Sequence, residues 1–293
     1  MAELTLRHLR TIPELSYILI SMTSNAIIER ASRCVPDSLV NDYWRDGAVV
    51  VRGLFTAEEV EQLCTGIEDN IARPSPRAIV ASEATDPGWF FEDFCNWQEN
   101  ASYESFIRST ALAAAAGRLM KSDQVRLYHD HLLVKNPGTR QKTPWHQDQP
   151  YYNVAGQQNV SLWIPVDPIC RVDTLEFVAG SHLGPWLLPR TFLDRQAKWF
   201  PAGALAESPD IDADRSAQNI IGWAVEPGDA VAFHMLAIHS AAGATNRRRV
   251  FSVRLLGDDI VHAPRQWRTS PPFEGLDDLP AGAPMEHKQF PLL

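Results

Sequence analysis

The sequence predicts a mainly β fold of the α+β class, a sandwich or barrel of short strands with supporting helices on its N-terminal side. From residue 124 onward, short stretches rich in β-branched and aromatic residues recur, and turn residues separate several of them. The earlier part of the chain is helical in character, because Thr56 opens a capping box and alanines dominate residues 111–116. A content of 45% hydrophobic and 22% charged residues is typical of a chain that buries a core.

The individual elements follow from these patterns. Helices are expected over residues 37–45, 56–70 and 111–120, and strands over residues 48–52, 124–134, 145–148, 158–166, 175–178, 220–225, 230–235 and 250–256. Residues 72–96 are rich in proline, aspartate and aromatic side chains, which favours an ordered loop over one end of the fold.

The domain organisation is expected to be simple, with one domain over residues 37–293 and an N-terminal extension over residues 1–36 that is flexible or locally docked. An apolar run near the N-terminus loosely resembles a secretory signal, but Pro13 interrupts its approach and no cleavage site follows. Residues 189–219 are too long for a hairpin loop and indicate a lid-like insertion. The tail from Ala263 is rich in proline and is expected to wrap the surface.

Charge and cysteine content argue against several classes of function. A net charge of −9 does not suit binding to nucleic acid or to an anionic membrane, and no run approaches the roughly 18 apolar residues needed to span a bilayer. The four cysteines are scattered without a C-x-x-C pair, which indicates reduced thiols in a cytoplasmic protein. The expected partner is a small molecule, and the sequence does not indicate an oligomeric state.

The most informative stretch is Trp145–Asp148, which contains an H-x-D step. In an extended strand residues i and i+2 project to the same face, so His146 and Asp148 are expected to present an imidazole and a carboxylate to one point. His239, which follows a turn and a strand, is the candidate third ligand. Two histidines and one carboxylate form the facial triad that binds non-haem Fe(II) and leaves positions open for O₂ and a co-substrate. This constellation predicts an oxidative enzyme.

Other histidines compete for a place in the site. His234 is more typical of a strand residue that is hydrogen-bonded within the core, and His182 of a turn. His129 and His131 share one face of a strand and could line a pocket, although a satisfied core histidine is the favoured interpretation of His129. The small residues 240–243 would let a cofactor approach the backbone after His239.

Three consecutive arginines, Arg247, Arg248 and Arg249, open the last apolar strand. A solvated basic turn is the plain interpretation. Alternatively, one guanidinium points inward and binds a carboxylate through two hydrogen bonds, the geometry to which arginine is suited. Trp163, in the middle of a strand, is more typical of a core aromatic on these grounds alone.

These segments together resemble the phytanoyl-CoA dioxygenase (phytanoyl-CoA hydroxylase) family of Fe(II)- and 2-oxoglutarate-dependent oxygenases. The resemblance covers roughly residues 42–259. It rests on several motifs in order and at family-like spacing, namely Asp46–Gly53, Thr143–Gln149, Leu175–His182, Glu226–Asp229, His239 and Arg248–Ser252.

The resemblance implies a double-stranded β-helix, that is, a jelly-roll or cupin-like core. It also implies that Fe(II) is bound by His146, Asp148 and His239. Arg248 best matches the arginine that pairs with the distal carboxylate of the co-substrate 2-oxoglutarate, and its two neighbours remain alternatives because the preceding loop is short.

Further residues of the co-substrate pocket follow from the same resemblance. Trp163 and His131 match residues that line the 2-oxoglutarate pocket. Ala241 departs from the pattern, because some members carry a serine there that helps to hold 2-oxoglutarate. Ser240 or another donor would then take that role.

The activity implied is hydroxylation of a small organic substrate, with O₂ consumed and succinate and CO₂ released. Related halogenases carry a small residue in place of the triad carboxylate, so Asp148 favours hydroxylation. Desaturation or ring formation is an alternative, and a cupin-like metal- or ligand-binding protein without turnover is an alternative of another class. The aromatic stretch Trp89–Trp97 and Tyr151-Tyr152 suit either an apolar substrate pocket or core packing.

Overall fold

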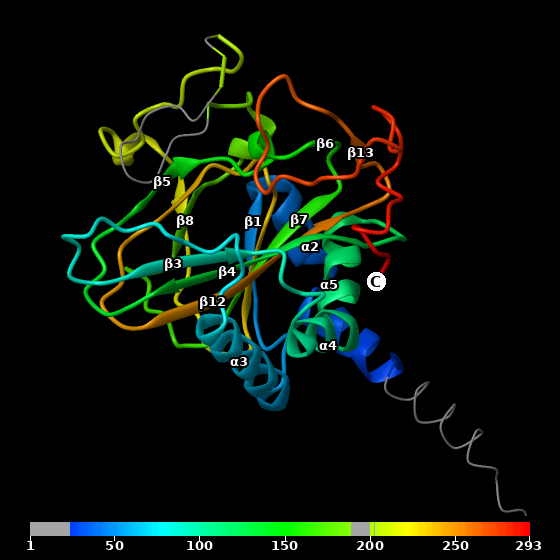
Figure 1. Ribbon diagram of the computed structural model, residues 1–293, viewed down its shortest axis with the longest axis horizontal. Helices are drawn as coiled ribbons and strands as arrows, with labels where there is room; N and C mark the ends of the chain where they lie inside the picture. The colour runs from blue at the N-terminus through cyan, green and yellow to red at the C-terminus, as the bar shows by residue number, and fades with distance from the viewer. Residues whose placement is uncertain (1–23, 189–199, 202) are drawn as a thin grey trace, which may run out of the picture.

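The computed structural model describes residues 24–188, 200–201 and 203–293 (Figure 1). Most of its strands form two antiparallel sheets that pack face to face. Across the large sheet the order is β1 (Ala48–Val51), β10 (Ala230–Phe233), β7 (Asn159–Pro165), β12 (Arg248–Leu256), β4 (Arg126–Lys135), β3 (Phe90–Phe94) and β2 (Ile79–Val80). Across the small sheet it is β5 (Thr143–His146), β11 (His239–Ala241), β8 (Leu175–Val178) and β9 (Ile220–Ile221). A separate pair joins β13 (Val261–His262) to β6 (Val154–Ala155).

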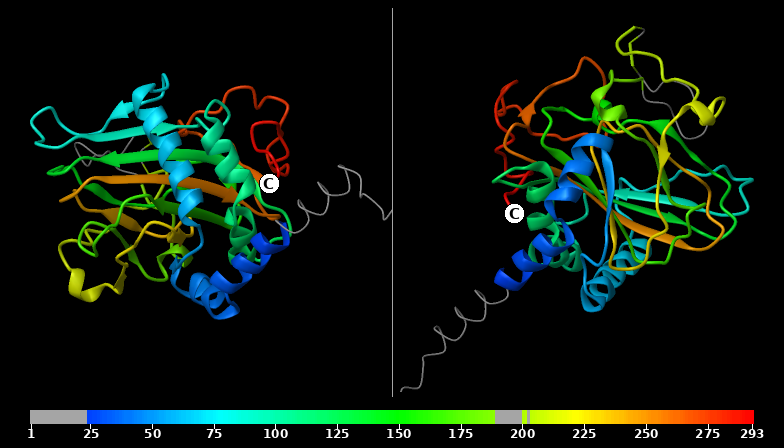
Figure 2. Two further views of the ribbon diagram at one scale, coloured as in Figure 1. Left: turned by 90° about the horizontal axis from the view of Figure 1, so that it is seen from below. Right: turned by 180° about the vertical axis from the view of Figure 1, so that it is seen from behind.

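Helices cover the outer face of the large sheet. They are α2 (Asp37–Asp46), α3 (Ala57–Ala72), α4 (Ala101–Ser109) and α5 (Leu112–Met120), with short 3₁₀ turns η1 (Gln149–Tyr151), η2 (Ser181–Leu183) and η3 (Arg215–Ala217) elsewhere. The left panel of Figure 2 shows α3 and α5 lying across the strands. The predicted capping box is confirmed, because Thr56 and Glu59 exchange side-chain and backbone hydrogen bonds at the start of α3.

Strand β12 contributes side chains both to the main hydrophobic core and to the cavity between the two sheets. Phe251, Val253 and Leu255 pack with the helices in the main hydrophobic core. The alternate residues Arg248 and Arg254 face the other way and line a cavity between the two sheets. Because successive side chains of a strand point to opposite faces, this alternation separates the apolar core from the polar interior.

The predicted fold class is confirmed, with helices on one side of a double-sheet core. Most predicted elements are present with boundaries shifted by a few residues, and the strand expected over residues 220–225 is limited to Ile220–Ile221. Helix α4 and the short strand β11 were not predicted. Residues 24–34 are helical and the buried Ala31 packs on the core, whereas residues 1–23 of the proposed extension lie outside the described residues.

The expected loop over residues 72–96 is wrong, because this segment supplies strands β2 and β3 to the large sheet. The acidic residues within Phe90–Phe94 concealed the strand, since carboxylates are seldom buried without a partner. Both of them have partners in the structure. Glu92 lies 3.3 Å from the ring of His131, and Asp93 accepts hydrogen bonds from the end of α3 and the loop that follows.

The insertion expected over residues 189–219 is described only in part, because residues 189–199 and 202 lie outside the described residues. In the described part, Ile211 packs with Trp145 and Ile238 on the outer face of the small sheet. No helix among the described residues combines the length and apolarity needed to cross a membrane.

The contact of Phe251 with the helix layer gives a test of this architecture. Phe251 is fully buried, and its ring centroid lies 4.3 Å from that of Tyr103 in α4. Phe251→Ala should lower the free energy of unfolding by about 3–5 kcal/mol, because it leaves a cavity between sheet and helices. Val172→Ala, at a residue that is 72% exposed, should change it by less than about 0.5 kcal/mol. Chemical denaturation measures both, and equal effects would contradict the proposed packing.

Candidate metal centre

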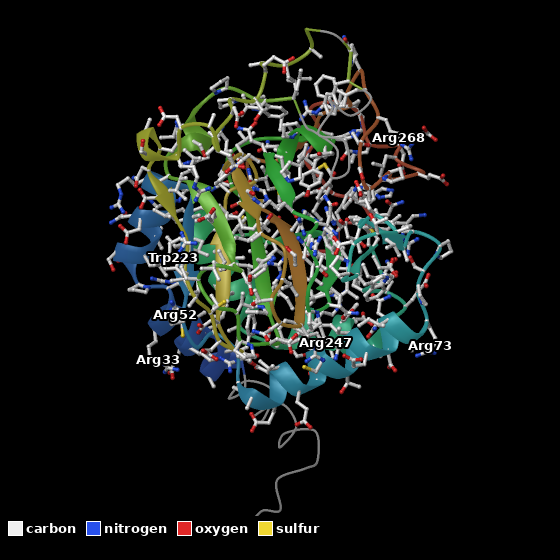
Figure 3. All side chains as sticks on the ribbon, turned by 90° about the vertical axis from the view of Figure 1, so that its left-hand side faces the viewer. Arg33, Arg52, Arg73, Trp223, Arg247 and Arg268 are labelled. Atoms are coloured by element: carbon white, nitrogen blue, oxygen red, sulfur yellow. The ribbon has the colours of Figure 1, made fainter. Side chains whose placement is uncertain are left out.

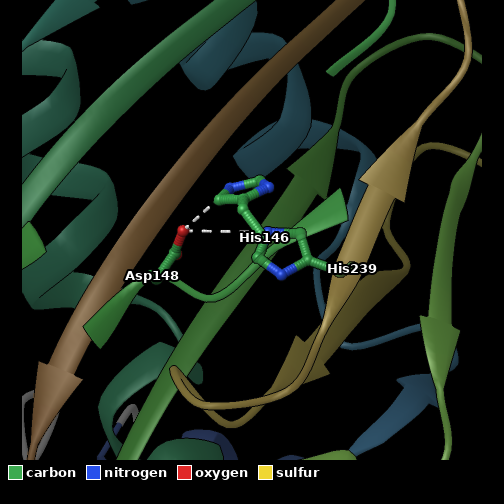
Figure 4. A group of neighbouring side chains, drawn as sticks. All are labelled: His146, Asp148 and His239. Atoms are coloured by element: carbon green, nitrogen blue, oxygen red, sulfur yellow. Dashed lines mark ion pairs between the residues drawn. The ribbon is translucent and has the colours of Figure 1, made fainter. Parts of the chain in front are cut away.

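Three side chains that are distant in the sequence meet between the two sheets (Figure 4). His146, Asp148 and His239 each offer a ligand atom, and these atoms lie within 4.8 Å of one another. The Nε2 atoms of His146 and His239 lie 3.4 Å and 3.7 Å from Oδ1 of Asp148. The two histidines are directly opposite each other on the paired strands β5 and β11. The structure therefore brings together the three residues singled out in the sequence.

The position of Asp148 differs from the one expected on a strand. Strand β5 ends at His146, and Asp148 has a helical backbone conformation (φ −78°, ψ −43°) that leads into η1. The backbone N–H groups of Asp148 and Gln149 both donate to the carbonyl of Met235, at 2.8 Å and 2.9 Å. Convergence with His146 thus depends on a turn held by the loop before β11, and not on strand alternation.

Both imidazoles are oriented by their own backbone. Nδ1 of His146 lies 2.8 Å from the carbonyl oxygen of Pro144, and Nδ1 of His239 lies 2.9 Å from that of Ala237. A carbonyl can only accept, so each Nδ1 carries the hydrogen and each Nε2 turns its lone pair toward Asp148. Two lone pairs and a carboxylate oxygen facing one another repel unless a cation lies between them. This donor set fits a divalent metal ion such as Fe(II).

The electrostatics keep these groups in the forms that bind metal. Burial alone would raise the pKa of Asp148, but the positive charge of Arg254 holds it well below its usual value. Nη2 of Arg254 donates to Oδ2 of Asp148 at 3.1 Å, and its Nε donates to the hydroxyl of Tyr152 at 3.2 Å. Burial lowers the pKa of His239 to about 3, so this ring is neutral. Metal ligation requires an ionised carboxylate and neutral imidazoles.

The three residues line a cavity of about 540 Å³ between the sheets. Arg248 and Arg254 line it from the same face of β12, six residues apart, which is ~20 Å along a strand. A larger groove of about 680 Å³ lies elsewhere on the surface and is lined mainly by polar loop residues around Asp86 and Arg140. It includes none of the three candidate ligands, so the cavity between the sheets is the candidate site.

The three consecutive arginines have different environments. Arg247 is exposed and pairs with Glu68 of α3 at 2.9 Å, at the surface position seen in Figure 3. Arg249 pairs with Asp167 at 2.5 Å on the helix side of the sheet. Arg248 is 6% exposed, lines the cavity and donates to the backbone carbonyl of Asp173. Burial lowers the pKa of Arg248 to about 10. Only Arg248 of the three can therefore reach a ligand in the cavity.

Trp163 and His131 also line the cavity, and His131 stacks on Phe94 with ring centroids 4.0 Å apart. The core position expected of His234 is confirmed, because this fully buried ring lies 3.0 Å from the carbonyl of Gln157.

The small residues after His239 serve two different contacts. Ala241 lines the cavity. Gly243 instead packs against the backbone of Thr139, where any side chain would collide, so its small size admits a neighbouring loop and not a cofactor. The expectation that small residues here let a cofactor approach the backbone is wrong for Gly243, because the Thr139 backbone takes that space.

The polar cavity residues that sequence reasoning did not select include His129 and Arg254. His129 was favoured as a core histidine, yet it lines the cavity beside His131 on the same strand face. Its spacing from His131 was the available signal. Arg254 lies six residues after Arg248, so the period of two on β12 was the signal for it.

Two facing antiparallel sheets that enclose a two-histidine, one-carboxylate cluster define a double-stranded β-helix with the site of a non-haem iron oxygenase. Residues 43–250 match the phytanoyl-CoA dioxygenase (PhyH) family. The chain belongs to this family and is an iron- and 2-oxoglutarate-dependent oxygenase. No curated protein matches its sequence.

Solved structures share the fold. SnoK, a non-haem alpha-ketoglutarate-dependent carbocyclase from nogalamycin biosynthesis, is 20% identical with a TM-score of 0.69, over 89% of this chain and 98% of that one. The epimerase SnoN, in complex with Fe3+, alpha-ketoglutarate and nogalamycin RO, is 21% identical with a TM-score of 0.68, over 87% and 97% of the two chains. EctD from S. alaskensis, with 2-oxoglutarate and 5-hydroxyectoine, is 17% identical with a TM-score of 0.62, over 84% of each.

The buried pair between Asp148 and Arg254 gives a second test, on metal-free protein. Arg254→Met should lower the free energy of unfolding by about 3–5 kcal/mol, because it leaves a buried carboxylate unpaired. Arg247→Met removes a surface ion pair by the same substitution and should cost at most about 1 kcal/mol. Denaturation curves measure both variants. Similar small losses would show that the pair does not hold Asp148 in place.

Proposed function

We propose that this enzyme hydroxylates a small organic substrate, with His146, Asp148 and His239 as the ligands of Fe(II) and Arg248 as the anchor of 2-oxoglutarate. The observation that carries the proposal is the meeting of three metal-ligating groups in a cavity into which a buried guanidinium also points. Iron with 2-oxoglutarate would supply the activation of O₂ and the oxidation of a substrate carbon, with succinate and CO₂ released.

The side chains of this chain have distinct tasks in the proposal. The three ligands occupy one side of the metal and leave positions open for the co-substrates. The guanidinium of Arg248 would bind the distal carboxylate of 2-oxoglutarate through two hydrogen bonds, and burial strengthens this interaction. Trp163 and His131 would line the same pocket. The three metal-ligating side chains are buried, which limits the access of water to the reacting groups.

Desaturation or ring formation in secondary metabolism is a second candidate for the reaction. It is supported by the likeness of the fold to that of a carbocyclase and of an epimerase. Asp148 favours both candidates over halogenation, since the resemblance to halogenases would require a small residue at this position. A protein that binds metal without turnover is disfavoured, because the cavity contains a candidate anchor for the co-substrate as well as the metal cluster.

The proposal also places the enzyme in the cytoplasm with a small-molecule substrate. Its four cysteines are free thiols, which suits a reducing compartment. The net charge of −9 does not favour nucleic acid as the partner.

The metal assignment is tested with His239→Ala. This variant should lose stoichiometric iron after anaerobic reconstitution, because two ligands remain where three are needed, and should release no succinate above background. His287→Ala removes a histidine that does not line the cavity and is the matched control. Iron is quantified by elemental analysis and succinate by chromatography. Full iron binding by His239→Ala would remove His239 from the site.

The co-substrate assignment is tested by comparing Arg248→Ala with Arg247→Ala. Loss of a hydrogen bond to a charged group costs about 1.5–3 kcal/mol, so Arg248→Ala should weaken 2-oxoglutarate binding roughly 10- to 150-fold. Arg247→Ala should leave this affinity within about twofold of the parent protein, since its side chain is outside the cavity. Anaerobic titration of the iron-loaded protein measures both. The reverse order would transfer the role to Arg247.

A further inference from the structure

Polar atoms of two facing residues on the cavity wall, one on β4 and one on β12, have no hydrogen-bond partner within the described part of the chain. They are Nε2 of His129 and Nη1 of Arg254. His129 is 1% exposed and Arg254 is 5% exposed, and both residues line the cavity. They are directly opposite each other on the paired strands β4 and β12. Buried polar groups of this kind normally have a hydrogen-bond partner, so two such groups without one on the same cavity wall point to a ligand.

The roles of the two atoms follow from their surroundings. Nδ1 of His129 lies 3.2 Å from the backbone carbonyl of Asp130, which can only accept, so Nδ1 carries the hydrogen and Nε2 presents a lone pair. Burial and the charge of Arg254 lower the pKa of His129 well below its usual value, which keeps the ring neutral. Nη1 of Arg254 can only donate. Two facing residues of the cavity wall therefore offer one acceptor and one donor.

A hydroxyl group matches this arrangement, because its oxygen accepts one hydrogen bond while its hydrogen donates another. Ethers and ketones only accept, and an ammonium group only donates. A carboxylate is disfavoured for two reasons. It has no hydrogen for His129, and it would add a negative charge beside Asp148, whose carboxylate already neutralises Arg254.

The position of the pair relates it to the metal centre. The neighbouring nitrogen of the same guanidinium, Nη2, lies 3.1 Å from Asp148, so a group bound at Nη1 lies beside the candidate iron ligands. Arg248 is six residues away along β12, toward the other end of the cavity wall. Phe94, Tyr151 and other apolar or aromatic side chains line the cavity as well. Charged side chains of Arg77, Glu92 and Arg268 also line the cavity. The site thus places a polar point near the metal beside apolar and aromatic surface.

We propose that His129 and Arg254 form a subsite for a hydroxyl group of the primary substrate, which is a neutral alcohol or phenol with an apolar body. The subsite holds this hydroxyl beside the metal while 2-oxoglutarate occupies the Arg248 end. This inference rests on the proposed function for the identity of the cavity as the active site, and on the two unpartnered atoms for the chemistry of the substrate.

The test compares three probes that differ in one group, namely phenol, toluene and benzoate. They are small enough to enter a cavity of about 540 Å³. Binding is measured anaerobically by calorimetry on the full-length protein loaded with Fe(II) and saturating 2-oxoglutarate. Phenol should bind about tenfold more tightly than toluene, which corresponds to about 1.4 kcal/mol, and more tightly than benzoate. Equal affinity for phenol and toluene, or no saturable binding of phenol, overturns the proposal.

Variants assign the preference to the two residues. His129→Leu removes the acceptor, and Arg254→Lys keeps a positive charge near Asp148 but loses the second nitrogen of the guanidinium. In each variant the affinities for phenol and toluene should become equal within about twofold. His287→Leu, at a histidine that does not line the cavity, should retain the tenfold preference. A preference that persists in both His129→Leu and Arg254→Lys overturns the assignment.

The same samples separate this inference from the proposed function. Iron content and 2-oxoglutarate affinity are measured in parallel on the parent protein. If both cofactors bind and phenol shows no advantage, the hydroxyl subsite is wrong and the proposed function stands. If neither cofactor binds but metal-free protein still prefers phenol in a manner that depends on His129, the subsite stands and the proposed function fails.

Discussion

A buried carboxylate, that of Asp148, is the constraint on which the interior of this fold depends. It is 5% exposed, and an ionised group at this depth requires compensating charge. The large sheet supplies that charge through Arg254 on β12, while the small sheet supplies the two neutral imidazoles, on β5 and β11, that would bind a metal ion together with Asp148. Asp148 therefore lies against side chains of both sheets. The relative position of the sheets is coupled to the geometry of the metal centre, since the same carboxylate serves both.

Strand β12 links the cavity around Asp148 to the hydrophobic core under the helices. Its outward residues, such as Phe251, belong to the core under the helices, and its inward residues include Arg248 and Arg254. A shift of one residue in the pairing with β4 would place both guanidinium groups in the apolar core and bring Phe251 into the cavity. The cost of burying two arginines in that way makes the register specific. The packing of the helix layer thus helps to fix the polar wall of the site.

The sequence was sufficient for the fold class and for the meeting of His146, Asp148 and His239, because these depend on patterns that are local or carried by a family resemblance. It was insufficient where the role of a residue depended on strand register, or where the location of a strand depended on a tertiary partner of a buried charged side chain. The choice among the consecutive arginines required the pairing of β12. Strand β3 was hidden by Glu92, whose burial is compensated by His131 on the neighbouring strand. The roles of the individual site residues remain predictions.

Arg248 and Arg254 make the two ends of the cavity electrostatically different. Among the described residues, the hydrogen bonds of Arg248 go to the backbone carbonyls of Asp173 and Ala242, which carry no net charge. The carboxylate of Asp173 acts on Arg248 without an ion pair between them among the described residues, so the guanidinium can still attract an anionic ligand. Arg254 is already paired with Asp148, so its remaining nitrogen offers a hydrogen bond without a net attraction for anions. With the roles proposed for Arg248 and Arg254, an anionic co-substrate and a neutral, hydroxylated substrate would be directed to opposite ends of one cavity, because the two arginines have different hydrogen-bond and ion-pair partners.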